Sequence, residues 1–231
     1  MMVDIFSSFD PATTLLFLMS PLMFWLSATM IFSSTFASMW PLISPTMIPL
    51  YTSINIITPQ TQRSFMINLK AMSHLISALF MLIIFMNITG LFPYIFSQTG
   101  HLILTLSFGL PLWLSLLLSG MMWNTKQFLA HFLPSGAPDW LNPFLVLIET
   151  VSISVRFITL SFRLGANITA GHIVLGLMGG YCSAAMFSSA PSMMTILMTQ
   201  SFFTLFEMGV ALIQAYIFCL LLTLYSDDHP K

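Results

Sequence analysis

Two long stretches of this sequence contain no charged side chain. No Asp, Glu, Lys or Arg occurs between Asp10 and Arg63, or between Lys70 and Lys126. Of the 231 residues, 6% are charged and 57% are hydrophobic, whereas a soluble domain carries about 25% charged residues. A chain this apolar cannot cover its surface with polar groups. The sequence therefore predicts an integral membrane protein with membrane lipid as its main surroundings.

The few polar and reactive residues exclude several other classes of protein. Six basic residues against seven acidic ones provide no basic patch for nucleic acid. The two cysteines, Cys182 and Cys219, are too few for a disulfide framework, and we interpret them as small buried thiols. We therefore expect no nucleic-acid partner, no metal site and no cofactor.

The apolar residues group into segments long enough to cross a membrane as helices. A spanning helix needs about 20 mostly apolar residues. Five segments meet this requirement, so we predict a single all-α membrane domain over residues 1–231 with five transmembrane helices. These spans cover about 13–34, 71–96, 101–122, 141–180 and 193–225. The last two are long for a hydrocarbon core of about 30 Å, so they must tilt strongly or extend beyond the bilayer.

The segment between the first two spans is rich in proline. Prolines stand at positions 41, 45, 49 and 59, and proline inside a helix removes a hydrogen bond and disfavours a straight span. Trp40 and Tyr51 suit a membrane–water interface. We predict an irregular stretch that lies at the membrane surface.

Lysine and arginine predict the orientation of the five spans. One face would hold the 35–70 loop, the 123–140 loop and the C-terminal tail, and the other face would carry no Lys or Arg. Because basic loops remain inside, the C-terminus is predicted inside and the N-terminus outside. The basic residues of the inner face are Arg63, Lys70, Lys126 and Lys231.

Ionisable residues reappear within or near the last two spans. A charge at the centre of a membrane helix costs about 2.5–3.5 kcal/mol on insertion scales, and such residues commonly mark ion or proton pathways. Glu149, Arg156 and Arg163 are seven residues apart. A helix turns about 100° per residue, so the three share one stripe, and Asn167 lies on the same side.

An antiparallel hairpin would bring these residues to three levels. A turn within 188–192, the sequence SSAPS, is favoured by its serines and proline. It places polar pairs toward the outer face, at mid-depth and toward the inner face. In that order the pairs are His172 with Glu207, Arg163 with Gln214, and Glu149 with Asp228.

Titratable groups at both ends with a fixed cation between them suggest a proton route that contains a barrier. Histidine and perturbed carboxylates change charge near neutral pH, whereas arginine stays protonated and acts as an electrostatic gate. Protons stopped at Arg163 would need another carrier with a carboxylate of its own. Small residues lie beside Arg163, and they either admit another helix or serve helix packing within this chain. They are Gly165, Ala166, Ala170 and Gly171.

Three sequence segments resemble a known family. RLGANITAGH at 163–172 and EMGVALIQAYIF at 207–218 resemble subunit a of the rotary ATP synthase membrane sector, in its mitochondrial form. HFLPSGAPDWLNPFLVLIET at 131–150 resembles the loop and helix start that precede the arginine in that family. The resemblance is strong from about 131 to 228 and looser before that.

The resemblance implies a specific function. In that family a non-catalytic stator subunit passes protons through two half-channels to and from a subunit c ring, beside other stator subunits, in the mitochondrial inner membrane. The N-terminus would then lie in the intermembrane space and the C-terminus in the matrix. The resemblance implies that Arg163 separates the two half-channels, with Asn167 and Gln214 beside it. It implies that His172 and Glu207 belong to the outer half-channel. It assigns Glu149 and Asp228 to the inner half-channel, where Asp227 is the alternative to Asp228.

One arginine and two other functions stay open at this point. Arg156 lacks the following LGAN pattern, and we interpret it as an inner-side partner of Glu149 in preference to a channel residue. A respiratory-chain subunit with haem would need histidines at matching depths, but only His172 lies well inside a span. A secondary transporter often shows internal repeats, which are not evident here.

Overall fold

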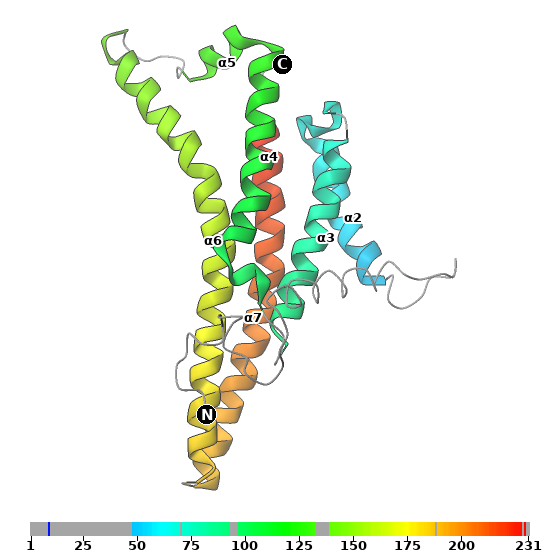
Figure 1. Cartoon of the computed structure of the whole chain (residues 1–231). Coiled ribbons are helices and arrows are strands. Elements are labelled where there is room, and N and C mark those ends of the chain that lie inside the picture. The colour runs from blue at the N-terminus through cyan, green and yellow to red at the C-terminus, as the bar shows by residue number, and fades with distance from the viewer. Residues whose placement is uncertain are drawn as a thin grey trace, which may run out of the picture.

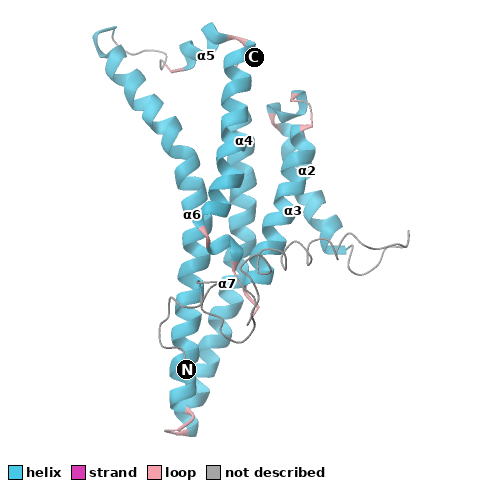
Figure 2. Ribbon diagram, viewed as in Figure 1, coloured by secondary structure: helices cyan, strands magenta, loops and turns pink. Residues whose placement is uncertain are grey.

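Helices form almost all of the structure. The computed structural model describes residue 9 and residues 48–69, 71–92, 97–132, 139–187, 189–227 and 229. Within these ranges the chain contains α-helices and short 3-10 helices and no strand (Figure 2). The predicted all-α membrane class is therefore confirmed. The predicted first span at 13–34 and the residue Asp228 lie outside the described ranges.

Four described helices are long and apolar enough to cross a membrane. They are α3 (Met72–Gly90), α4 (Leu102–Trp123), α6 (Asn142–Ala185) and α7 (Ala190–Asp227). The last three match the predicted third, fourth and fifth spans closely. Helix α3 ends at Gly90, earlier than the predicted end near 96. Pro93 explains the difference, because a proline disfavours helical geometry in the residue before it.

The two long helices form the antiparallel hairpin that the sequence predicts. Helix α6 ends at Ala185 and α7 begins at Ala190, so the connection begins two residues before the predicted turn at 188–192 and overlaps its start. At about 1.5 Å per residue, the 44 residues of α6 extend for about 66 Å, well beyond a hydrocarbon core of about 30 Å. Figure 1 shows the start of α6 leaning away from α4.

Shorter helices connect and flank these spans. Helix α5 (Thr125–His131) follows α4 directly, and η5 (Asp139–Leu141) precedes α6. The 3-10 helix η4 (Gln98–Gly100) precedes α4, and η3 (Phe65–Asn68) precedes α3. Asn124 caps α5, because its side-chain oxygen accepts a hydrogen bond from the Gln127 backbone N–H.

The proline-rich segment is more regular than predicted. Residues Ile48–Arg63 form helix α2, which packs against α3 (Figure 1). Ser53, Ile57 and Thr61 recur every four residues and are buried, so they form one helical face. Pro59 lies inside the helix with an exposed side chain. The prediction of an irregular backbone is wrong for these residues, because tertiary packing of this face outweighs the cost of the proline; the predicted place at the membrane surface stays a prediction.

A hydrophobic core joins α2, α3, α4, α6 and α7. It contains Ile76, Phe80 and Ile83 of α3 and Phe218 and Leu222 of α7, all at most 3% exposed. Small residues lie where α4 crosses α6. A Cβ atom at Gly109 would lie 4.0 Å from the Ser161 Cβ atom, and one at Gly165 would lie 3.8 Å from the Thr105 hydroxyl, both ordinary van der Waals distances. Small residues at such crossings let helix backbones lie close together.

Candidate functional site

At mid-depth, two amides join the long helices. Asn167 Nδ2 donates a hydrogen bond to Gln214 Oε1 at 2.9 Å, and Gln214 is 4% exposed. The sequence predicts that Gln214 lies opposite Arg163, but the hydrogen-bond partner of Gln214 in the structure is Asn167, one helical turn further along α6. The predicted hairpin register is therefore correct to within about one turn of 3.6 residues.

Arg163 lies on the outside of the described chain. Its side chain is exposed, whereas Leu164 and Gly165 beside it are buried. The four small residues noted in the sequence divide between two faces of α6. Gly165 and Gly171 are buried within the chain, and Ala166 and Ala170 are exposed on the open surface near Arg163. A second protein helix could therefore approach only the alanine side.

Toward the α6–α7 turn, Glu207 is buried against the backbone of α6. The residue is 6% exposed. A Cβ atom built on Gly171 would lie 2.5 Å from Glu207 Oε2 and 2.8 Å from Oε1, closer than any real contact. The buried oxygen Oε2 has no hydrogen-bond partner among the described residues. Glycine at 171 thus provides the space that this carboxylate occupies.

His172 follows Gly171 directly, at the level of Glu207. The residue is half-buried, and its ring lies edge-on to Phe9 with centroids 6.2 Å apart. Its Nε2 atom is buried and makes no hydrogen bond within the described ranges. The structure therefore brings the predicted pair to one level, with Glu207 in contact with Gly171, the neighbour of His172.

Further polar groups near this level were not singled out from the sequence. Asn87 of α3 is fully buried and donates from Nδ2 to the Ala211 backbone oxygen at 3.2 Å. Its Oδ1 atom and the hydroxyl of buried Thr99 have no partner in the described part of the chain. The available signal was a polar side chain in a charge-free span, which is costly unless it faces protein or water.

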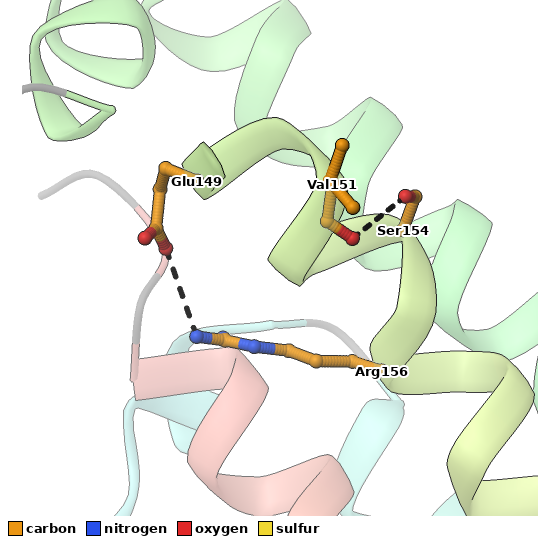
Figure 3. A network of polar contacts seen from close by, with 4 residues as sticks. All are labelled: Glu149, Val151, Ser154 and Arg156. Atoms are coloured by element: carbon orange, nitrogen blue, oxygen red, sulfur yellow. Dashed lines mark hydrogen bonds and ion pairs between the residues drawn. The ribbon is translucent and has the colours of Figure 1, made fainter. Parts of the chain in front are cut away.

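At the other end of α6, Glu149 and Arg156 form an ion pair. Arg156 Nη2 lies 3.8 Å from Glu149 Oε1, and Figure 3 shows the two side chains facing each other across two helical turns. The Arg156 guanidinium also lies 5.6 Å from the centroid of the Tyr225 ring of α7, within the range of a cation–π contact. The interpretation of Arg156 as a partner of Glu149 is confirmed.

This ion pair lines a cavity of about 80 Å³. A water molecule needs roughly 10–15 Å³ of such space, so the cavity has room for several. Its wall is mainly apolar and comes from α4, α5, α6 and the end of α7. The lining residues that carry polar or charged groups are Trp113, Glu149, Arg156, Tyr225 and His229.

The end of α7 is held at the same end of the molecule. Asp227 Oδ1 accepts a hydrogen bond from the Phe65 backbone N–H at 2.7 Å. His229 stacks on the Phe65 ring with centroids 5.6 Å apart and shares a hydrogen bond of 3.2 Å with the Ser119 hydroxyl. The Asp227 carboxylate therefore binds the backbone of η3. The sequence alone did not indicate this contact.

The polar groups consequently occupy separate levels along the hairpin. Glu149 precedes Arg163 by about 21 Å of helix, and Gly171 follows Arg163 by about 12 Å, at 1.5 Å per residue. Titratable side chains lie at both ends, and a permanent cation lies on the surface between them. Such an arrangement can bind and release protons at two places without a direct link between them.

Comparison with known proteins points to a single family. The sequence model of a family described as "ATP synthase A chain" matches residues 12–227. Proteins named "ATP synthase subunit a" are similar over nearly the whole chain. That of Aedes aegypti is 39% identical over 236 residues, and that of Anopheles gambiae is 40% identical over 233, each comparison covering 99% of both chains. That of the snail Albinaria caerulea is 39% identical over 230 residues and covers 100% of both.

Proposed function

Because the chain belongs to the ATP synthase A chain family, we propose that it is the proton-conducting stator subunit of the membrane sector. It carries no nucleotide chemistry. It passes protons to and from a ring of subunit c and is held beside the ring by other stator subunits. It lies in the mitochondrial inner membrane, with its C-terminus in the matrix and its N-terminus in the intermembrane space.

The exposure of Arg163 is the observation that carries this proposal. A cation facing lipid at the centre of a helix costs about 2.5–3.5 kcal/mol, and the described chain does not cover this side chain. The surface beside it is small at Ala166 and Ala170, so another helix can approach closely. A neighbouring helix with a carboxylate would both cover and neutralise the charge.

Two half-channels supply the ring from opposite sides. Glu207 and His172 form the outer one, where unpaired buried polar atoms provide sites for water. Glu149 belongs to the inner one, where the cavity beside Arg156 lies. The separation of these groups along α6 supports the division. Asp228, which the family resemblance places in the inner half-channel, lies outside the described residues.

Arg163 divides the half-channels, with Asn167 and Gln214 holding the adjacent helices together. The guanidinium stays protonated at any physiological pH, so it repels a proton moving directly from one half-channel to the other. It attracts the deprotonated carboxylate of subunit c, which is released after it takes up a proton. The amide hydrogen bond between Asn167 and Gln214 links α6 to α7 one helical turn from Arg163.

The test is the replacement Arg163→Ala in the assembled complex. We expect normal assembly, with coupled ATP synthesis abolished, because the ring carboxylate loses its fixed counter-charge and protons lose the positive barrier between the half-channels. Lys126→Ala, which removes an exposed cation of α5, is the matched control and should leave synthesis unchanged. Undiminished synthesis in the Arg163→Ala complex would refute the proposed role.

A further inference from the structure

His229 lies in the inner cavity but has no part in the function described so far. It belongs to the short tail after α7 and lines the same cavity as Glu149, Arg156 and Tyr225. The structure places its ring beside the ends of α4 and α7, at the end of the molecule where Glu149 lies.

The position of the ring is fixed from two sides. The imidazole stacks on Phe65 of η3 with centroids 5.6 Å apart, at an angle of 21° between the ring planes. On another side its Nε2 atom shares a hydrogen bond with Ser119 Oγ of α4 at 3.2 Å. A hydroxyl can donate or accept, so this hydrogen bond is compatible with both the neutral and the protonated ring.

The electrostatic surroundings tolerate a change of charge on this ring. From α6, Glu149 and Arg156 face the cavity, and their formal charges cancel in the 3.8 Å ion pair. From α7, Tyr225 contributes a neutral phenol, and Asp227 holds η3 two residues before His229. The described lining residues of α4 and α5 carry no formal charge. Apart from Arg156, which Glu149 compensates, no other described residue that lines the cavity carries a formal positive charge.

We propose that His229 is a proton-relay residue, which exchanges protons between the water near Glu149 and the inner solution. The proposal rests on the proposed function of the chain. A neutral imidazole becomes imidazolium by taking up one proton and returns to neutral by releasing one. Each cycle thus moves one proton and leaves the residue unchanged. Imidazole suits this task because its charge changes between pH 5 and 8.

The test uses the complete complex in lipid vesicles, with only the pH of the inner-side solution varied from 5 to 8. In the unmodified complex we expect proton flux through the membrane sector to show a transition in this range. His229→Asn retains a hydrogen-bonding side chain but cannot titrate. This variant should lose the transition, and its proton flux should fall about tenfold. A positioned acid–base group contributes ~10²-fold or more, but here water partly replaces the histidine, so the loss is smaller.

Two comparisons separate proton relay from a purely structural role. His74→Asn alters a histidine of α3 that does not line the cavity and should keep the transition. Imidazole added to the inner solution should restore flux to His229→Ala. If His229→Asn keeps the normal pH profile while His229→Ala loses flux, the residue only holds the tail and the proposal is wrong. His229→Gln takes the place of the asparagine variant should that variant fail to assemble.

The proposal and the underlying function can fail independently. If Arg163→Ala abolishes coupled synthesis while His229→Asn keeps the normal profile, only the relay role is wrong. If Arg163→Ala leaves synthesis intact, the proposed function of the whole chain is wrong, whatever His229 does.

Discussion

At the scale of single residues, the contact between Glu207 and Gly171 limits where the buried carboxylate can lie. Glu207 has little exposure, and both of its carboxylate oxygens lie within 2.8 Å of the position that a Cβ atom on residue 171 would occupy. The glycine is therefore required for its lack of volume. Backbone freedom is not the reason, because the residue lies inside a regular helix.

Gly171→Ala should accordingly impair proton entry by displacing Glu207. We expect flux in reconstituted vesicles to fall about tenfold or more, since displacing a proton-transfer group by about 1 Å is costly. Adding Glu207→Asp, which shortens the side chain by one methylene, should recover part of the loss. Gly179→Ala is the control, because its new Cβ would meet no side chain or other helix among the described residues within 4 Å. Equal flux in the Gly171 and Gly179 variants would show that the carboxylate is not confined.

Residue patterns predicted part of this geometry. The spacing of polar residues along 149–214 placed Glu207 level with His172 and placed Gln214 within one turn of its partner, because regular helices convert sequence separation into depth. The sequence could not predict which small residues of α6 pack within the chain and which stay exposed. Gly165 and Gly171 serve packing within the chain, and Ala166 and Ala170 remain exposed. Only the neighbouring helices determine which side is covered.

At the scale of helices, the segment that precedes the α3 span forms a helix of its own, α2. Helix α2 was missed because its buried face consists of Ser53, Ile57 and Thr61, which give a weak apolar signal, while its prolines argue against a helix. By contrast, the long apolar runs of α4, α6 and α7 were located to within a few residues, because lipid leaves the backbone no alternative to helical hydrogen bonding.

The end of α7 anchors the connection between α2 and α3. Asp227→Ala removes the acceptor for the Phe65 N–H, whereas Asp227→Asn keeps a side-chain oxygen there. A hydrogen bond of this kind contributes about 1 kcal/mol, which corresponds to roughly a fivefold change in a local opening equilibrium. Hydrogen exchange at the Phe65 amide should therefore quicken about fivefold in the alanine variant and less in the asparagine variant. Unchanged exchange in Asp227→Ala would exclude this anchor.

At the scale of the whole molecule, the described helices gather the predicted inner-face loops at one end. Phe65 after α2, Ser119 near the end of α4 and His229 after α7 are in contact there, and Figure 1 shows α5 and the start of α6 at that end. Arg63 and Lys126 belong to the connections at this end. Their shared position agrees with the prediction that these connections share one face; that this face is the inner one stays a prediction.

A second feature of the whole molecule is the positive charge of Arg163, which no described part of the chain covers. Arg163 is exposed beside Ala166 and Ala170, although the hydrogen-bonded amides next to it are wholly or half buried. In the proposed function, a rotor passes along this face and brings its carboxylates to the arginine one after another, so the guanidinium must be exposed. The whole proposed mechanism therefore depends on what covers this side of α6.

Disulfide cross-linking in the assembled complex tests that dependence most directly. The measurement uses a chain with Cys182 and Cys219 replaced by alanine, a cysteine at Ala166, and a cysteine beside the membrane carboxylate of subunit c. The account predicts a cross-link that prevents rotation. Ser161→Cys, at a position with 0% exposure on the same helix, should give none. Cross-linking from position 161, or none from position 166 with the complex intact, would contradict the account.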